Sequence, residues 1–344
     1  MHKKIPKCKV IVTGGAGFIG SHLTDNLLSA GYAVKVLDNL SNGSRDNLAE
    51  AITQDHFTFI EGDILNKQVC QEAMQEVDYV FHLACLGVRH SLHSPFENHK
   101  VNAEGTLNIL EAAKRSNVQH FFYISTSEVY GRTTDFPITE SSPTNPLTVY
   151  GASKLAGEHY TKAFHECYQL PVTVLRIFNN YGPRAHYEGD AGEVIPRSIV
   201  RILYEKQPVV FGDGSVTRDF FFVKDTAAAL VKLLEMARTP EQEEIVAKTF
   251  NIGTGTEISM KELMEKVLHK MGKNNLTIAF KPDRPADVPR LWVKADNFTK
   301  FTGFKPSYSF DKGLEETINY YSQKIEESNL LNEVQEVNWI KENV

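Results

Sequence analysis

A glycine-rich segment, GGAGFIG (14–20), lies between two regular runs near the start of the chain. The run before it, KVIVT (9–13), is short, apolar and rich in β-branched residues, which favours a buried strand. The run after it, 18–30, has helical spacing and ends at Gly31, a residue type common at helix C-termini. A strand, a glycine-rich turn and a helix in this order predict the first unit of a parallel α/β sheet.

The same alternation continues through the first half of the chain. Strands that alternate with helices form βαβ units and hence a parallel sheet. We expect further strands at 34–37, 57–60, 79–83, 121–124 and 172–177, and further helices at 67–75, 95–116 and 148–168. Residues 1–180 are therefore predicted to form an α/β domain with a Rossmann-type, doubly wound parallel sheet.

The pattern changes after about residue 180, where glycines and prolines interrupt the chain. Short strands and helices then follow, so we predict that residues 181–323 are mainly a smaller α/β lobe that binds substrate. The insertion 184–194 lies where substrate loops lie and is a candidate determinant of specificity. Residues 324–344 are acidic and polar, which indicates a surface helix or a partly ordered C-terminal tail.

The composition is that of an ordinary globular protein, with 42% hydrophobic and 23% charged residues among 344. A formal net charge of −6 argues against a nucleic-acid partner, which needs a basic surface. No stretch approaches the ~20 apolar residues of a membrane helix, and no signal-peptide pattern is recognisable. The four cysteines show no CxxC spacing and are expected to be reduced thiols. We expect a cytoplasmic protein without a membrane partner.

Three histidines, His90, His93 and His99, are close enough in the sequence to suggest a metal site. No cysteine or nearby acid completes a tetrahedral ligand set. We therefore expect no metal, and interpret these residues as loop histidines or substrate contacts.

The glycine-rich segment has the context of a dinucleotide site. Gly14, Gly17 and Gly20 permit a tight turn that brings the backbone close to a pyrophosphate, and the helix N-terminus offers free N–H groups to the anion. Asp38 ends the second strand, 18 residues after Gly20, where a carboxylate binds the ribose hydroxyls. Because Asp38 would repel a 2′-phosphate, the sequence favours NAD over NADP, although Arg45 lies nearby.

A Tyr-Lys pair is the candidate catalytic group. Tyr150 and Lys154 open one helix, and their spacing places both side chains on one face. The ammonium group of Lys154 can lower the pKa of the Tyr150 phenol, which could then take a proton from a hydroxyl while hydride leaves the same carbon. Such a pair is common on ordinary helices, but here it follows a strand that ends in STSE (125–128), where α/β folds place ligand chemistry.

These motifs together resemble the extended short-chain dehydrogenases/reductases, specifically the NAD-dependent nucleotide-sugar (NDP-sugar) epimerase/dehydratase family. The resemblance covers about residues 9–321 and rests on GGAGFIG, Asp38 and further motifs, namely Asp63-Ile64, HLA (82–84), Val101-Asn102, STSEVYG (125–131), YGASK (150–154), RIFNNYGPR (176–184), GDGSVTRDF (212–220) and RPADVPRLW (284–292). It implies NAD as cofactor and a nucleotide-diphosphate sugar as substrate. It also implies a homodimer through a four-helix interface, for which the helices at 103–114 and 153–168 are candidates.

The resemblance implies roles for individual residues. The cofactor contacts would be Gly14, Gly17, Phe18, Ile19, Gly20, Asp38, Asn39, Asp63, Ile64, Leu83, Ala84, Asn102, Ser125, Tyr150, Lys154 and Ile177. The catalytic residues would be Thr126, Ser127, Glu128, Tyr150 and Lys154. The substrate contacts would be Thr126, Asn179, Arg218 and Arg284, and the guanidinium groups of the two arginines suit phosphate oxygens.

Enzymes of this family begin by oxidising C4 of the sugar and differ in the steps after that oxidation. Glu128, two residues after Thr126, is placed for chemistry at C5 and C6, which favours an NDP-hexose 4,6-dehydratase of the UDP-GlcNAc type or a similar one in bacterial-type surface sugar biosynthesis. Ser127 stands where dTDP-glucose dehydratases usually have an acid. A 4-epimerase of the UDP-glucose or UDP-glucuronate type and a UDP-glucuronate decarboxylase remain open. So do a simple alcohol dehydrogenase that releases NADH and a non-catalytic NAD-binding sensor or scaffold.

Overall fold

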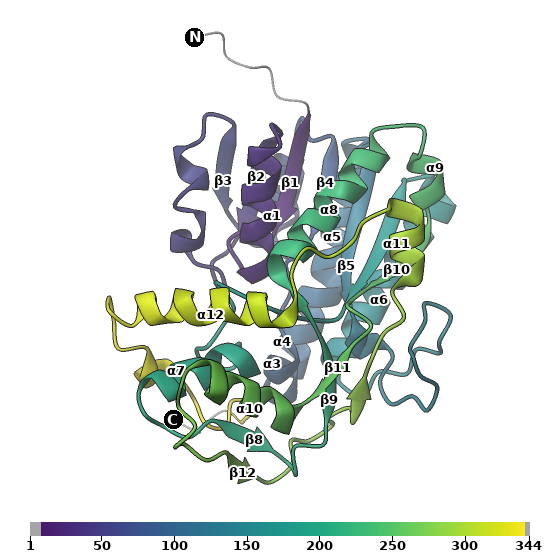
Figure 1. Ribbon diagram of the computed structural model, residues 1–344. Coiled ribbons are helices and arrows are strands. Elements are labelled where there is room, and N and C mark those ends of the chain that lie inside the picture. Colours follow the sequence, from purple (N-terminus) through teal and green to yellow (C-terminus); the bar gives the residue numbers. More distant parts are fainter. Residues whose placement is uncertain (1–7, 341–344) are drawn as a thin grey trace.

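A seven-stranded parallel sheet forms the centre of the computed structural model, which describes residues 8–340 (Figure 1). Its strand order is β10-β6-β5-β4-β1-β2-β3, so the order reverses between β1 and β4. The strands are β1 (Lys9–Thr13), β2 (Ala33–Asp38), β3 (Phe57–Glu61), β4 (Tyr79–His82), β5 (His120–Thr126), β6 (Val172–Ile177) and β10 (Lys248–Ile252). The predicted doubly wound parallel sheet is confirmed.

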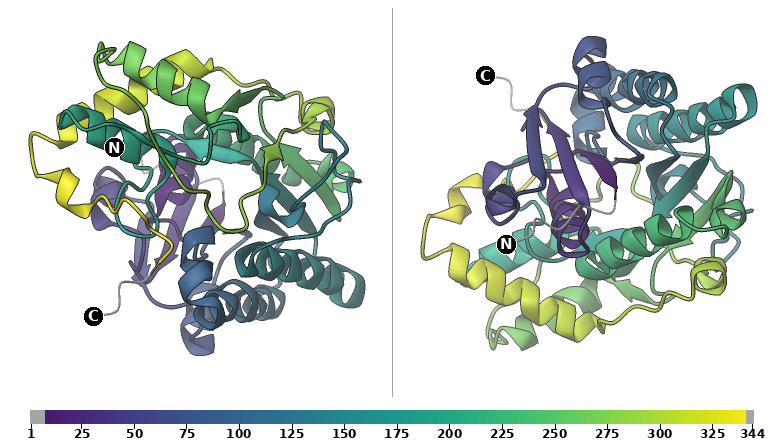
Figure 2. Two further views of the ribbon diagram at one scale, coloured as in Figure 1. Left: turned by 90° about the horizontal axis from the view of Figure 1, so that it is seen from below. Right: turned by 90° about the horizontal axis from the view of Figure 1, so that it is seen from above.

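Helices cover both faces of this sheet (Figures 1 and 2). One face packs against α1 (Phe18–Ser29), α8 (Val223–Ala237) and α11 (Asp296–Thr302). The other packs against α2 (Lys67–Ala73), α5 (Gly105–Arg115) and α6 (Val149–Tyr168). The helix expected at 95–116 is α4 (Pro95–His99), a π-helical turn (Lys100–Glu104) and α5 in succession, and α3 (Val88–His93) precedes it.

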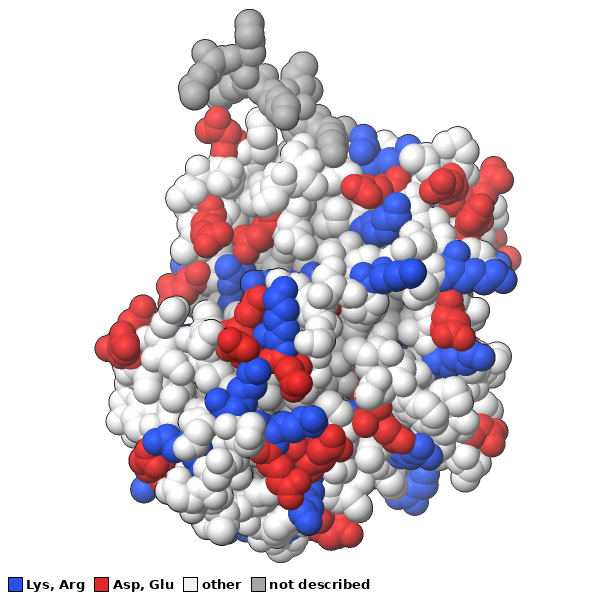
Figure 3. Space-filling model, in the orientation of Figure 1, with Lys and Arg blue, Asp and Glu red and all other residues white. Residues whose placement is uncertain are grey.

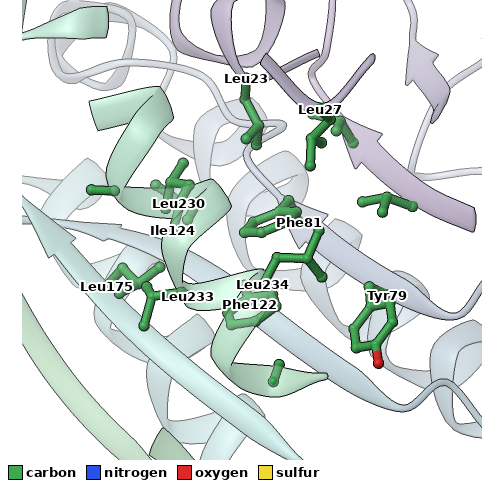
Figure 4. Close-up of a cluster of buried hydrophobic side chains, with 14 of the residues drawn as sticks. Leu23, Leu27, Tyr79, Phe81, Phe122, Ile124, Leu175, Leu230, Leu233 and Leu234 are labelled. Carbon is green, nitrogen blue, oxygen red and sulfur yellow. The ribbon is translucent and has the colours of Figure 1, made fainter. Parts of the chain in front are cut away.

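The apolar faces of α1 and α8 meet the sheet in one buried cluster (Figure 4). Leu23 and Leu27 come from α1, and Leu230 and Leu234 from α8, while Phe81 lies beneath them on β4. Spacings of four residues place each leucine pair on one side of its helix. Strands of this sheet are covered on both sides, which is why they read as continuous apolar runs in the sequence.

A smaller lobe lies beside one end of the sheet, at the bottom of Figure 1. One of its sheets contains β7 (Asn179–Tyr181), β9 (Thr217–Phe222), β11 (Glu257–Ser259) and β13 (Arg290–Leu291), and the other pairs β8 (Val209–Phe211) with β12 (Ala279–Lys281). The helices α7 (Val194–Leu203), α10 (Met260–Lys270) and α12 (Phe310–Lys324) pack with these strands around a separate apolar core.

Part of the range 181–323, which is predicted to form mainly the smaller lobe, belongs to the main sheet. Its strand β10 pairs in parallel with β6 and becomes an edge of the main sheet. Its helices α8 and α11 cover that sheet, and the short α9 (Gln242–Ile245) leads into β10. The chain therefore returns to the main sheet after its first excursion into the lobe.

The C-terminal segment also differs from the predicted surface helix or partly ordered tail. After α12 it forms a short 3₁₀ turn (Leu330–Glu333), and Leu330, Asn338 and Trp339 are buried against the smaller lobe. Residues 341–344 of the predicted tail lie outside the described residues.

Charged side chains of both signs are interspersed on the face shown in Figure 3. That face carries no broad patch of a single sign, in keeping with the weakly negative net charge of −6. Among residues 8–340, no helix is both long and apolar enough to span a bilayer.

A buried ion pair fixes helix α6 to the sheet. Glu158 on α6 pairs with Arg176 on β6 at 2.7 Å, and both side chains are at most 5% exposed. Ser125, on β5, donates its hydroxyl to the same carboxylate at 2.5 Å. Because Tyr150 and Lys154 lie on the same helix, this ion pair helps to set their position against the end of β5.

Replacing Glu158 with glutamine should lower the free energy of unfolding by about 3–5 kcal/mol, because Arg176 would stay buried without a counter-charge. Urea denaturation of the purified protein measures this change. The matched control is Glu61→Gln, which removes the partner of the exposed Arg45 and should cost less than about 1 kcal/mol. Similar losses in the two variants would contradict the stabilising role of the buried pair.

Candidate active site

A cavity of about 520 Å³ lies where the strand order reverses, between the carboxyl ends of the strands and the smaller lobe. This is the place where open α/β sheets bind ligands. Every predicted site residue except Asn102 lines it, namely Gly14, Gly17, Phe18, Ile19, Gly20, Asp38, Asn39, Asp63, Ile64, Leu83, Ala84, Ser125, Thr126, Ser127, Glu128, Tyr150, Lys154, Ile177, Asn179, Arg218 and Arg284. The structure therefore brings the predicted cofactor, catalytic and substrate residues into one continuous site.

The glycine turn has the tight geometry that a pyrophosphate requires. Gly14 has a φ of +71°, and a Cβ there would lie 2.8 Å from the backbone nitrogen of Ala84. A Cβ on Gly20 would lie 2.1 Å from the carbonyl oxygen of Gly14. Helix α1 begins after Gly17 without a side-chain cap, so its first N–H groups point to the cavity uncapped. These features fit the diphosphate of a dinucleotide.

Asp38 ends β2 at the rim of this turn. Its carboxylate accepts hydrogen bonds from the backbone N–H of Ala16 at 2.9 Å and of Leu40 at 2.8 Å. Burial raises the pKa of Asp38, and the two backbone hydrogen bonds oppose that effect. Asn39, the next residue, donates to the Asp63 carboxylate at 3.2 Å. Two carboxylates and an amide thus surround the position expected for the ribose hydroxyls.

Asn102 is not among the residues that line the cavity, so its role as a cofactor contact stays a prediction. Its side chain is 1% exposed, and its amide group bonds to the backbone N–H and carbonyl of Leu86, at 2.8 and 3.0 Å. Further hydrogen bonds join it to Asn98 and Ser153. Asn102 therefore connects the segment after β4 to helix α6, and its polar atoms already have partners within the protein.

The Tyr-Lys pair lies on the first turns of α6, opposite Thr126 at the end of β5. Burial raises the pKa of Tyr150 well above its ordinary value, and a hydrogen bond with Thr126 opposes this. Burial also lowers the pKa of Lys154, whose ammonium group lies 4.4 Å from the ring centre of Tyr123. In this structure burial, rather than Lys154, dominates the pKa of Tyr150, so the expected lowering of that pKa by Lys154 stays a prediction.

Glu128 follows Thr126 by two residues and faces the same cavity. Its backbone N–H donates to the Thr126 hydroxyl at 3.2 Å, which starts a short 3₁₀ turn. Burial raises the pKa of the Glu128 carboxyl, while the positive charges of Arg218 and Arg284 lower it. A carboxyl group with these opposing influences is suited to both accept and donate a proton.

Two predicted arginines converge on one carboxylate that the sequence analysis missed. Arg218 and Arg284 donate to the same oxygen of Asp287, at 2.5 and 2.6 Å. Asp287 lies within the motif that contains Arg284, three residues after it, and this spacing was the available signal. The pair of guanidinium groups keeps a net positive charge beside Glu128, which suits an anionic group of a substrate.

Several buried polar atoms at the cavity lack a hydrogen-bond partner. They include Asn179 Oδ1, Arg89 Nε and Arg197 Nε, and all three side chains line the cavity. Arg89 forms an ion pair with Glu193 at 3.1 Å, which connects it to the 184–194 insertion. Because buried polar groups without partners are costly, these atoms indicate that the cavity accepts a polar ligand.

The histidine group predicted to hold no metal is engaged with acidic residues. His93 contacts Asp190 at 2.8 Å and His90 contacts Glu97 at 3.5 Å. Within residues 8–340, no set of three or more His, Cys, Asp or Glu side chains has the geometry of a metal site. The contact of His93 instead joins α3 to the insertion.

Comparisons with known proteins agree with this site. A family model described as GDP-mannose 4,6 dehydratase matches residues 11–317. A putative UDP-glucose 4-epimerase of Methanocaldococcus jannaschii is 36% identical over 317 residues, which cover 90% of this chain and 97% of that protein. UDP-glucuronic acid decarboxylase 2 of Arabidopsis thaliana is 33% identical over 323 residues, which cover 92% of this chain and 69% of that protein.

A solved structure supports the same conclusion. DesIV, a dTDP-glucose 4,6-dehydratase from Streptomyces venezuelae solved with NAD bound, matches with a TM-score of 0.87 and 29% identity, over 94% of this chain and 99% of that one. Relatives with three different reactions thus share the fold over nearly the whole chain. The chain therefore belongs to the extended short-chain dehydrogenases/reductases, in the family of NAD-dependent nucleotide-sugar epimerases and dehydratases.

Proposed function

We propose that this protein is an NAD-dependent NDP-hexose 4,6-dehydratase. The observation that carries the proposal is the position of Glu128, which lines the same cavity as Tyr150 and Thr126. A 4-epimerase needs no further acid or base after the sugar C4 is oxidised, whereas a dehydratase needs a carboxyl group at C5 and C6. When bound, NAD would supply the redox chemistry, as acceptor of the C4 hydride and donor of that hydride to C6. C5 then gains a proton from solvent, which balances the proton that Tyr150 takes from O4.

Tyr150 is assigned the first proton transfer, from the sugar O4. Thr126, which lines the same cavity, is assigned a hydrogen bond to the same oxygen. The positive charge of Lys154 favours the phenolate form, which must be reached against the burial that raises the Tyr150 pKa. The resulting C4 ketone makes the proton on C5 acidic.

Glu128 is assigned the two proton transfers of the elimination step. Its carboxylate takes the proton from C5, the electron pair forms the C5–C6 double bond, and the C6 hydroxyl leaves as water with a proton from the Glu128 carboxyl. Ser127 is assigned a hydrogen bond to the departing hydroxyl, an assignment supported by its position in the lining of the same cavity. The opposing effects of burial and of Arg218 on the Glu128 pKa suit a group that gains and loses a proton in one cycle.

Proton NMR of the purified enzyme with NAD and separate NDP-sugars tests the proposal. The panel is UDP-GlcNAc, GDP-mannose, dTDP-glucose, UDP-glucuronate and UDP-glucose. A new C6 methyl doublet together with a 4-keto product is expected with one of the hexoses, and we expect UDP-GlcNAc or a similar sugar. A binding-only sensor would change none of the spectra, and a simple alcohol dehydrogenase would accumulate NADH.

A 4-epimerase is the second candidate, favoured by the 36% identity to the putative UDP-glucose 4-epimerase. It would invert the C4 signal without producing a methyl group. A decarboxylase, favoured by the 33% identity to the plant enzyme, would convert UDP-glucuronate to a pentose. Either spectrum would remove the elimination role from Glu128 while leaving the roles of Tyr150 and Thr126 in place.

Replacing Asp38 with alanine should weaken NAD binding and reduce the preference for NAD over NADP. The carboxylate would no longer accept from the ribose hydroxyls or repel a 2′-phosphate. Calorimetric titration with each cofactor measures both affinities. Asp38→Asn is the matched control, because its amide oxygen can keep a backbone contact to Ala16 or Leu40 but carries no charge. An unchanged ratio of NAD and NADP affinities in both variants would contradict this role of Asp38.

We also propose a homodimer that packs α5 and α6 of each subunit together. Large apolar side chains are exposed at these helices and the neighbouring α4: Phe96 is 90% exposed and Tyr168 54%. Size-exclusion chromatography with light scattering should give twice the chain mass of 38.7 kDa, and a monomer at micromolar concentration would contradict the proposed dimer.

A cytoplasmic location stays a prediction from the sequence.

A further inference from the structure

The C-terminal segment, residues 333–340, folds back onto the smaller lobe and is held there by hydrogen bonds. The Asn338 side chain is 1% exposed and donates to the carbonyls of Gly189 and Gly192, both at 3.1 Å. Arg197, on α7, donates to two backbone carbonyls of the segment. The segment and the 184–194 insertion are therefore joined into one wall of the cavity.

Trp339 forms an aromatic corner with Phe211 in this wall. The two ring centres are 4.5 Å apart and the rings are inclined at 77°, an edge-to-face pair. Trp339 is 9% exposed, and both side chains line the cavity that contains Tyr150. Both rings therefore contribute aromatic surface to the cavity, and a flat group can stack on such a surface.

The corner and the reacting groups come from different parts of the fold. Phe211 ends β8 in the smaller lobe, whereas Thr126 ends β5 in the main sheet (Figure 1), and both line the cavity. Arg284 and Arg197 line the same cavity. Arg197 lies 3.4 Å from Asn338, the neighbour of Trp339. The cavity thus combines acid–base groups at the main sheet, a set of cations and an aromatic corner in the smaller lobe. A nucleotide sugar has matching chemistry, with a sugar, a diphosphate and a flat base.

We propose that Trp339, together with Phe211, binds the nucleobase of the substrate, and that the C-terminal segment thereby helps to select the nucleotide. This inference rests on the nucleotide-sugar substrate of the proposed function. It assigns a specificity role to a part of the chain that lies beyond the last helix. Its test measures the binding of nucleoside diphosphates and does not depend on which reaction the enzyme catalyses.

The chain contains two tryptophans, Trp292 and Trp339, which allows a direct optical test. Trp292 does not line the cavity, and its indole N–H donates to the Gly255 carbonyl at 2.8 Å. Trp292→Phe therefore leaves Trp339 as the single tryptophan signal. Titration of this variant, loaded with NAD, with UDP, GDP or dTDP should quench its fluorescence as the preferred diphosphate binds. Binding in calorimetry without any fluorescence change would overturn the proposal.

The affinity change tests the same contact in the full chain. Trp339→Ala should weaken the preferred diphosphate about ten-fold, the size expected for loss of one base–aromatic stack, and leave NAD affinity unchanged. Trp339→Phe should recover most of the loss, and removal of residues 335–344 should cost at least as much as Trp339→Ala. Wild-type affinity in Trp339→Ala, or no binding of any of the three diphosphates, would overturn the proposal. A dehydratase, epimerase or decarboxylase spectrum in the NMR experiment leaves this result unaffected.

Discussion

Replacing Tyr150 with phenylalanine should lower kcat by about 10²- to 10⁴-fold, the usual contribution of a positioned general base. The variant loses only the hydroxyl that takes the proton from the sugar O4. The ring stays in place at the start of α6, so NAD and nucleotide-sugar affinities should change little. Steady-state kinetics with the substrate found by NMR, together with calorimetric titration of NAD, measure these quantities.

The matched control is Tyr79→Phe, which also removes one phenolic hydroxyl. That hydroxyl donates to Gln119 at 2.7 Å and lies away from the cavity, so kcat should stay within about two-fold of the wild type. Near-normal turnover of Tyr150→Phe would remove Tyr150 from its assigned role. A large loss of NAD affinity in that variant would instead indicate that Tyr150 acts by shaping the cofactor site.

The regular elements could be predicted because their signals are local. The strand expected at 172–177 has the same bounds as β6, and the strand expected at 9–13 those of β1. Both are short apolar runs between breaking residues. The sheet to which a strand belongs is not a local property. Nothing near residues 248–252 indicates that β10 returns to the main sheet beside β6, because that pairing depends on contacts between distant segments.

Much of the candidate site could also be predicted from the sequence. Motif residues such as Asp38 and Tyr150 line the cavity because the carboxyl ends of parallel strands meet at one edge. Asn102 shows what the sequence leaves open, because its buried amide bonds to Leu86 within the protein, and the sequence does not distinguish that from a ligand contact. Trp339 was missed because its partner Phe211 lies far away in the sequence.

The second large effect is expected for Glu128→Gln, which keeps the shape of the side chain but removes its proton transfer. C4 oxidation depends on Tyr150 and should survive, so substrate should still produce NADH absorbance in a single turnover. The later steps require a carboxylate to take the C5 proton, so the methyl product should fall by about 10²- to 10⁴-fold. Deuterium from D₂O should also fail to enter C5, a readout that separates loss of elimination from loss of binding.

The direction of the Glu128 pKa predicts a pH dependence for the same step. A base must be deprotonated to act, so raising its pKa moves the low-pH loss of activity to a higher pH than an ordinary glutamate would give. The loss should arise in the elimination and leave C4 oxidation unchanged. Removing Arg284, whose charge lowers the Glu128 pKa, should move this low-pH loss of activity to a still higher pH.

Full activity of Glu128→Gln, with an inverted C4 signal and no methyl group, would identify an epimerase, because that reaction needs no proton transfer at C5.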